Sequence, residues 1–313
     1  MSIKEERIFI EGDVRLGATI ATADHEGKKP AILLIMGTGN MDRDGNGKGL
    51  HTDMYKNFAW QFAEWGFVTV RYDKRGTHES SGKKPLYGFE DLVNDAVSVI
   101  RYMKTLPYVE ADKIIVFGHS EGGMIATVLS DREDTAGLMV IGAAGMSLKD
   151  ALHYQNRELA EEVKNTKGLK GLLLRSASSE EKNNAKVDSM YAKCSATDKD
   201  KAFIKGGIIN AKWIREHGAY SADDMVAKLK NYGKPVLAIT GTKDLSADYK
   251  ELDRLQDLPN VECYAPEGVN HILREVDDEN SILKVRKQYA RLSKNPIHKG
   301  TEEKMHEWLS QFN

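Results

Sequence analysis

The sequence of 313 residues is poor in cysteine, almost neutral in net charge and free of long hydrophobic runs. Its two cysteines, Cys194 and Cys263, are too few for a disulfide framework and stand in no metal-ligand spacing. A net charge of −2 provides no long-range attraction to nucleic acid or anionic lipid, so we expect neither nucleic acid nor a membrane as a partner. The longest apolar stretches, such as residues 31–36, are too short to cross a bilayer.

The amino-terminal residues 1–11 are charged and contain no apolar run typical of a signal peptide. We therefore expect a cytoplasmic protein. Hydrophobic residues make up 41% and charged residues 29% of the chain, which is ordinary for a globular protein in water. A chain of this length can bury a large core without a metal or a disulfide, and it suits one large α/β domain with an insertion.

Apolar runs alternate with segments of helical spacing along much of the chain. Four of the runs are continuous, as in strands that are buried on both faces of a parallel sheet. These strands are predicted at residues 31–36, 67–72, 114–117 and 138–144, with helices between them at 55–65, 89–106 and 124–129. Further strands are predicted at 235–240 and 261–265, helices at 249–258, 281–292 and 302–312, and a leading hairpin at 7–11 and 18–23. This order predicts a mainly parallel sheet with helices on both faces.

Residues 149–232 interrupt this alternation. The block is rich in lysine and glutamate, has mostly helical propensity and contains no convincing buried strand. Its strongly apolar pieces are residues 172–174 and 203–209. We therefore predict a core domain formed by residues 1–148 and 233–313, with a helical cap of residues 149–232 inserted between its two parts.

Gly118-His119-Ser120-Glu121-Gly122 fits the pattern G-x-S-x-G and lies between the predicted strand at 113–117 and the helix that starts at Glu121. A nucleophilic serine needs this position on a sharp turn from strand to helix, with glycines where the backbone leaves no room for a side chain. The turn points the hydroxyl at the helix N-terminus, which favours negative charge. The alternative is a glycine-rich turn whose serine merely caps the helix. The strand-to-helix context favours Ser120 as a nucleophile.

A general base would have to follow, because in proteins with this motif the acid and then the histidine come after the serine. His271, His298 and His306 come late enough in the chain. His306 falls in the last predicted helix and His298 in an expected surface loop. His271 follows a short loop after the last strand, where an imidazole can reach the sheet edge that carries Ser120. We therefore predict His271 as the base.

The acid should follow the preceding strand. Asp244 comes directly after the strand at 235–240, at the same carboxyl edge of the sheet. Its carboxylate would accept the Nδ1 hydrogen of His271 and stabilise the imidazolium. Asp248 is the reserve candidate, although it is better placed at the start of the following helix.

Two amide donors are needed to stabilise a tetrahedral oxyanion. The backbone amide of Glu121, directly after the serine, is one predicted donor. The other is the backbone amide of Thr38, which lies between Gly37 and Gly39 in the loop after the strand at 31–36. The side chains of the two donor residues are not part of this prediction.

The same loop nearly matches an EF-hand calcium loop, with Asp42-Arg43-Asp44-Gly45-Asn46-Gly47 and with Asp53 at the twelfth position. A strand enters the loop where a helix would be needed, Asp53 replaces the usual glutamate, and Gly49 occupies a position that is usually apolar. We therefore expect the acidic side chains to make turn hydrogen bonds, and we predict no metal site.

Together these motifs resemble the α/β-hydrolase superfamily, and in particular its dienelactone-hydrolase-like and serine-aminopeptidase-like carboxylesterases, which include cinnamoyl and feruloyl esterases. The resemblance rests on residues 37–39 and 42–46, Asp73-Lys74-Arg75-Gly76, residues 118–123 and 241–244, and Asn270-His271. It implies the α/β-hydrolase fold with Ser120, Asp244 and His271 as the triad. It also implies oxyanion donors at Thr38 and Glu121, and no cofactor. Met36 departs from the pattern, since many relatives have a histidine there.

These predictions favour a carboxylic ester hydrolase that works through an acyl-enzyme on Ser120. The charge-rich cap argues against a greasy interfacial lid, so we expect esters of small to medium acyl groups as substrates. The sequence leaves the oligomeric state open, including a homodimer. Three alternatives remain: a serine peptidase or amidase with the same triad, a non-catalytic binding protein of the same fold, and a calcium-responsive protein that uses residues 42–53.

Overall fold

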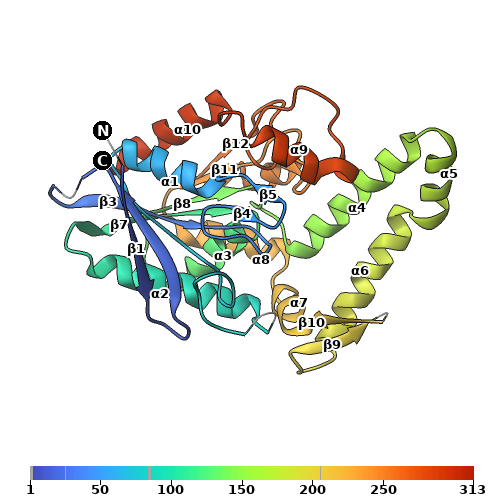
Figure 1. Ribbon diagram of the computed structural model, residues 1–313, viewed down its shortest axis with the longest axis horizontal. Helices are drawn as coiled ribbons and strands as arrows, with labels where there is room; N and C mark the ends of the chain where they lie inside the picture. The colour runs from blue at the N-terminus through green and yellow to red at the C-terminus, as the bar shows by residue number, and fades with distance from the viewer. Residues whose placement is uncertain (1–2, 25, 84–85, 205) are drawn as a thin grey trace.

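The computed structural model describes residues 3–24, 26–83, 86–204 and 206–313. Its centre is an eight-stranded sheet in the order β1-β2-β6-β3-β7-β8-β11-β12 (Figure 1). The strands are β1 (Lys4–Ile10), β2 (Leu16–Thr22), β3 (Lys29–Ile35), β6 (Val68–Tyr72), β7 (Val109–His119), β8 (Gly137–Ile141), β11 (Val236–Ile239) and β12 (Val261–Tyr264). β2 pairs antiparallel with β1, which confirms the predicted leading hairpin, and it also pairs antiparallel with β6. Every other pairing in the sheet is parallel, which confirms the predicted architecture.

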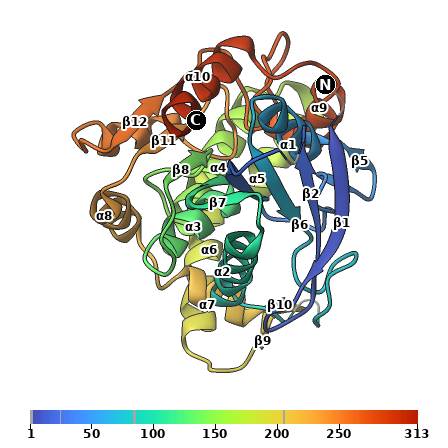
Figure 2. The same cartoon turned by 90° about the vertical axis from the view of Figure 1, so that its left-hand side faces the viewer.

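Helices cover both faces of the sheet (Figures 1 and 2). One face packs against α2 (Phe89–Thr105), α3 (Glu121–Leu129) and α8 (Ala222–Tyr232). The other packs against α1 (Met54–Glu64), α9 (Val285–Leu292) and α10 (Lys299–Leu309). Parallel crossovers are right-handed, and the chain runs from β3 to β6 in one direction of the strand order but from β6 to β7 and β8 in the other. For this reason α1 lies on one face and α2 and α3 lie on the other.

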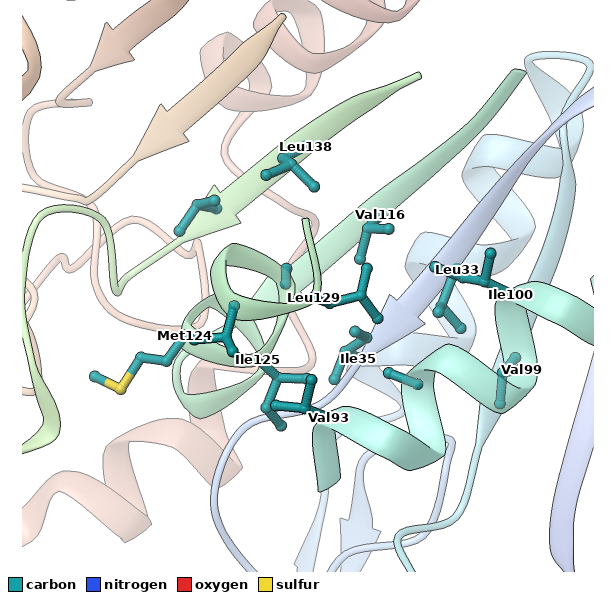
Figure 3. Packing of buried hydrophobic residues seen from close by; sticks show 14 of the residues in the cluster. Leu33, Ile35, Val93, Val99, Ile100, Val116, Met124, Ile125, Leu129 and Leu138 are labelled. Carbon is teal, nitrogen blue, oxygen red and sulfur yellow. The ribbon is translucent and has the colours of Figure 1, made fainter. Parts of the chain in front are cut away.

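The core is divided by the sheet into two layers because successive side chains of a strand point to opposite faces. On β3, Leu33 and Ile35 belong to the layer under α2 and α3, whereas Ile32 and Leu34 belong to the layer under α1. Figure 3 shows the first layer, where side chains of β3, β7 and β8 meet Val93 and Ile100 of α2 and Ile125 and Leu129 of α3. Burial on both faces explains why the strands are continuous apolar runs in the sequence.

The region predicted as a cap begins with three helices, α4 (Leu148–Asn165), α5 (Gly168–Ala177) and α6 (Glu180–Ser195), which form an arm that extends away from the sheet (Figure 1). It continues through β9 (Lys201–Ile204), β10 (Gly207–Asn210) and α7 (Ala211–His217). Tyr191, Cys194 and Ile214 form a small core of its own. α8, which ends the predicted range, packs against α3 and adds Met225 and Leu229 to the main core.

Several predicted elements differ from the structure. The apolar piece at 203–209 is an antiparallel hairpin of β9 and β10, in which Phe203 pairs with Ile208 and both side chains are exposed. The helix predicted at 249–258 is a 3₁₀ helix, η1 (Tyr249–Leu255), whose three-residue repeat puts Leu252 and Leu255 on the same buried side. The helix predicted at 281–292 begins as a 3₁₀ turn, η2 (Ile282–Lys284), before α9.

The remaining short elements are β4 (Asn46–Gly47), β5 (Leu50–His51) and η3 (Ser310–Phe312). None of the described helices is long and apolar enough to span a membrane.

Candidate active site

Loops from five strands meet at the carboxyl edge of the sheet, which is where the open sheets of α/β proteins bind ligands. Gly37 and Thr38 follow β3, Lys74 follows β6 and Ser120 follows β7. Asp244 follows β11 and His271 follows β12. Parallel strands all end at the same edge, so residues that are up to 234 positions apart in the sequence, from 37 to 271, lie around one site.

Ser120 lies on a strained turn between β7 and α3. Its backbone has φ 55° and ψ −125°, a conformation that non-glycine residues rarely adopt and that costs about 1–3 kcal/mol. The turn is fixed by a hydrogen bond of 2.8 Å from the Ser120 amide to the Ile141 carbonyl of β8. Gly122 has no room for a side chain, because a Cβ there would lie 2.1 Å from the Ile35 carbonyl oxygen. The local structure is therefore the sharp strand-to-helix turn that the sequence pattern predicts.

The structure brings His271 and Asp244 together. His271 Nδ1 lies 2.7 Å from Asp244 Oδ2, and both side chains are buried. The other carboxylate oxygen of Asp244 accepts backbone hydrogen bonds from Ser246 at 2.7 Å and Ala247 at 3.0 Å. These contacts fix the orientation of the carboxylate. Asp244 contacts the imidazole of His271 at Nδ1 and not at Nε2.

Ser120 and His271 line the same pocket, which has a volume of about 200 Å³. The pocket is bounded by the loop of Gly37 and Thr38 on one side. Its other walls are mostly apolar and come from Met41, Leu50, Thr52, Met54, Tyr55, His119, Ile272 and Tyr289. None of the described lining residues is an aspartate, a glutamate, a lysine or an arginine. A larger cavity of about 620 Å³, lined by residues of α6 such as Tyr191 and by Arg254, contains none of the predicted site residues.

The other candidates lie elsewhere. His298 is the N-cap of α10, where its Nδ1 accepts a hydrogen bond from the Thr301 amide at 3.3 Å. His306 lies within α10 and stacks on Trp65 at 4.5 Å between ring centroids. Asp248 is the N-cap of η1, as predicted, and also pairs with Arg157 of α4 at 2.5 Å.

The loop at residues 42–53 is held by hydrogen bonds between its own side chains and backbone. Asp42 Oδ1 accepts from the amides of Asp44 at 3.0 Å and Asn46 at 2.8 Å. The Asn46 side chain accepts from the Thr52 and Asp53 amides and donates to the Asp53 carboxylate at 2.7 Å. The predicted turn hydrogen bonds are thus present. Across the described part of the chain, no group of three or more histidine, cysteine, aspartate or glutamate side chains is arranged to hold a metal ion.

Sequence reasoning assigned no role to His119, although it stands inside the motif. Its Nε2 lies 2.9 Å from the His271 carbonyl oxygen and its Nδ1 lies 2.8 Å from the Tyr55 hydroxyl, which also accepts from the Gly37 amide at 2.9 Å. Burial, reinforced by the nearby His271, lowers the pKa of His119 to about 3. A neutral His119 with its proton on Nε2 can therefore donate to the His271 carbonyl and accept from the Tyr55 hydroxyl. This row of hydrogen bonds joins the loop of Gly37 to the backbone of His271.

Lys74 and the side chain of Glu121 were also missed. Lys74 Nζ forms a buried ion pair with the Glu121 carboxylate and donates to the Gly37 carbonyl oxygen at 2.7 Å. The same carboxylate accepts from Trp213 Nε1 at 2.7 Å and contacts His217 Nε2 at 3.1 Å, both from α7. The position of Lys74 at the carboxyl end of a strand was a signal that could have drawn attention to it.

The cap region also contacts the loop that carries Asp244. The hydroxyl of Tyr154 in α4 donates to the Asp244 carbonyl oxygen at 2.7 Å, and Gln155 Nε2 donates to the Ser246 carbonyl oxygen at 3.1 Å. α4 therefore supports the carboxylate side of the site, and α7 supports the serine side.

Comparison with known families identifies the class of the protein. Residues 45–262, more than half of the chain, match the hydrolase family described as serine aminopeptidase, S33. The chain belongs to this family. Among curated proteins, the S33 family member is similar to Esterase EstD of Thermotoga maritima, with 25% identity over 161 residues. That match covers 50% of this chain and 37% of the relative, so little more than a third of the relative's length is matched.

Solved structures extend the likeness of this S33 family member over almost the whole chain. Est1E from Butyrivibrio proteoclasticus, in complex with ferulic acid, has a TM-score of 0.57 and 19% identity, and the match covers 91% of this chain and 96% of Est1E. The proline iminopeptidase of Mycobacterium smegmatis has a TM-score of 0.58 and 16% identity, with 98% of each chain covered. The Pyrococcus furiosus esterase Pf2001 has a TM-score of 0.55 and 13% identity, with coverages of 99% and 93%. These likenesses confirm the predicted α/β-hydrolase fold.

Proposed function

We propose that the protein is a serine hydrolase that cleaves carboxylic esters of small to medium, uncharged acyl groups. The observation that carries the proposal is the buried His271–Asp244 pair, whose imidazole lines the same pocket as Ser120 on its strained turn. The S33 family match supports hydrolysis, and the similarity to Esterase EstD favours an ester as the substrate.

In the proposed reaction, Ser120 Oγ attacks the ester carbonyl carbon while its proton passes to His271 Nε2. Asp244 retains the hydrogen bond to Nδ1, which fixes the tautomer and stabilises the imidazolium. Collapse of the tetrahedral intermediate breaks the bond to the alcohol, which leaves with the proton from His271. A water molecule then attacks the acyl-enzyme with His271 as its base, and the acid and the free serine are regenerated.

The backbone amides of Thr38 and Glu121 would stabilise the oxyanion. A Cβ at Gly37 would lie only 2.9 Å from the Cβ of Ser120, so the loop that carries Thr38 passes close to the nucleophile. Glu121 is the first residue of α3, where amide groups are not used by the helix and the helix dipole favours negative charge. Removal of one such donor lowers kcat by about 10²–10³-fold in other serine hydrolases.

The residues that line the pocket favour an uncharged substrate. Its described lining offers neither a carboxylate for a substrate ammonium nor a lysine or arginine for a substrate carboxylate. Its volume of about 200 Å³ and apolar side chains such as Met41, Leu50 and Ile272 suit a short aliphatic or a single aromatic group. An aminopeptidase would need an anion to bind the free amine of its substrate, so the pocket favours an esterase.

Two measurements test the proposal. A fluorophosphonate should label Ser120 in the wild-type protein, and labelling should disappear in Ser120→Ala. Ser120→Ala should also lose hydrolysis of p-nitrophenyl acetate, with the unfolding transition of the wild type retained. Turnover that survives in Ser120→Ala would refute the assignment.

The substrate class is tested with matched pairs of leaving groups. We expect naphthyl esters of acetate and butyrate to be cleaved at least about 10²-fold faster, in kcat/KM, than aminoacyl naphthylamides, because the described lining of the pocket offers no carboxylate for the free amine. The reverse order would favour the peptidase.

A further inference from the structure

We propose that Lys74 is a positioning residue of the oxyanion hole and that the Glu121 carboxylate holds it in place. The inference rests on the proposed function, since it concerns the two amides that would bind the oxyanion. It adds two side chains to a site whose predicted donors were backbone groups alone.

The first step of the argument is the peptide bond between Gly37 and Thr38. Its carbonyl oxygen belongs to Gly37 and its N–H to Thr38, and in a planar trans peptide these two groups point in opposite directions. Lys74 Nζ donates to the Gly37 carbonyl oxygen at 2.7 Å. This bond fixes the plane of the peptide and therefore the direction of the Thr38 N–H. A charged donor on the carbonyl also polarises the peptide and makes its N–H a stronger donor.

The second step is the partner of Lys74. The side chains of Lys74 and Glu121 are 4% and 1% exposed, and they form a direct ion pair. The carboxylate also accepts from Trp213 and contacts His217. Burial alone would raise the pKa of Glu121, but the ammonium of Lys74 and the bond to His217 outweigh it and hold the pKa well below its usual range. Glu121 is thus ionised, and its negative charge keeps Lys74 at the peptide.

The two proposed donors are linked through this pair. Glu121 supplies one donor with its backbone amide, and its side chain anchors the lysine that orients the other. An isolated buried ion pair is rarely a net gain in stability, because both charges lose their hydration. The bond from Lys74 to the Gly37 carbonyl gives this pair a role beyond stability. It sets the geometry of a peptide that must be preorganised before the substrate arrives.

The pair also connects the oxyanion hole to α7. Trp213 and Glu121 both line another pocket, with a volume of about 300 Å³, together with Thr38, Gly39, Asn40, Tyr87 and Asn210. A shift of α7 would remove two of the partners of the carboxylate. The position of this helix is therefore expected to affect the catalytic step as well as substrate access.

The test uses the whole chain of 313 residues and its variant Lys74→Met, which keeps the length of the side chain and removes its charge and donors. We expect kcat for p-nitrophenyl acetate to fall about 10–100-fold, somewhat less than the loss of a donor itself, while KM changes less than about threefold. Lys104→Met is the matched control. Lys104 lies on α2 and pairs with Glu133 at 3.0 Å, and its replacement should leave kcat unchanged.

A second readout separates positioning from mere folding. A trifluoromethyl ketone inhibitor adds to Ser120 Oγ, the carbonyl double bond becomes an oxyanion, and His271 takes the serine proton. We expect its affinity for Lys74→Met to fall by the same factor as kcat/KM. If Lys74→Met does not fold, because the buried Glu121 carboxylate loses its lysine partner, the double variant Lys74→Met/Glu121→Gln removes both charges and takes its place.

The outcomes are distinguishable. If the wild type is active and Lys74→Met has the same kcat and the same inhibitor affinity, the positioning role is refuted and the esterase proposal stands. If the wild type cleaves no ester but is labelled by a fluorophosphonate, the proposed substrate class is refuted. Slower labelling of Lys74→Met would then still support the role of the lysine. If the wild-type serine is not labelled at all, both proposals fail.

Discussion

The buried His119 makes a prediction about acid stability. Its pKa in the folded protein is about 3, mainly because burial disfavours the charged imidazolium and because His271 lies close by. In the unfolded chain the pKa is that of an ordinary histidine, about 6.5. Between these two values the unfolded chain takes up a proton that the folded protein does not. The stability that the neutral histidine provides is therefore complete above about pH 6.5 and is lost as the pH falls toward 3.

The magnitude follows from the two pKa values. Each pH unit below 6.5 removes about 1.4 kcal/mol, so lowering the pH from 7.5 to 5.0 should cost about 2 kcal/mol through His119 alone. The variant His119→Gln does not titrate, and its amide can still donate to the His271 carbonyl. We expect the variant to be less stable at pH 7.5 but to lose about 2 kcal/mol less than the wild type between the two pH values.

Urea unfolding followed by tryptophan fluorescence at pH 7.5 and pH 5.0 measures both differences. Every other titrating group contributes to wild type and variant alike, so the difference between the two proteins isolates the histidine. Equal losses of stability in the two proteins would refute the reasoning, since they would mean that His119 is protonated in the folded state or retains its charge-free form in the unfolded chain.

Three further predictions concern the site. Asp244→Asn should lower kcat by about 10⁴-fold in p-nitrophenyl acetate hydrolysis, because an amide can donate to His271 Nδ1 and stabilise the wrong tautomer; a loss below about tenfold would argue against Asp244 as the acid. Gly142→Ala would place a Cβ 2.9 Å from the His271 ring at a backbone φ of +62°, so we expect both a lower melting temperature and at least about a 10²-fold loss of kcat, measured by thermal unfolding and steady-state kinetics. Ile272→Ala should enlarge the pocket and raise the kcat/KM ratio of hexanoate to acetate esters about tenfold, and an unchanged ratio would show that Ile272 does not contact the acyl chain.

The sequence predicts the sheet and the turn of Ser120 because their signals are local. A strand buried on both faces is a continuous apolar run, and a strand-to-helix turn without space for side chains needs glycines, as Gly122 against the Ile35 carbonyl illustrates. The pairing of His271 with Asp244 was also predictable, since both follow strands that end at the same edge.

The contact of Lys74 with the Gly37 loop could not be predicted. Nothing near Lys74 in the sequence indicates that its ammonium reaches the Gly37 carbonyl, because β6 and β3 become neighbours only in the sheet. The hairpin of β9 and β10 was missed for a different reason. Phe203 and Ile208 are apolar yet exposed, so burial, on which the pattern argument depends, gives no signal there.

The contact of α7 with Glu121 limits which segments can be exchanged between related hydrolases to change substrate specificity. The arm of α4, α5 and α6 extends into solvent, and its distal part could be shortened or replaced (Figure 1). Residues 210–217 differ from the arm, because Trp213 and His217 contact the carboxylate of Glu121, the residue that follows Ser120. If Glu121 acts as proposed, a graft that replaces residues 210–217 should change kcat together with substrate selectivity, and the two effects would be hard to separate afterwards.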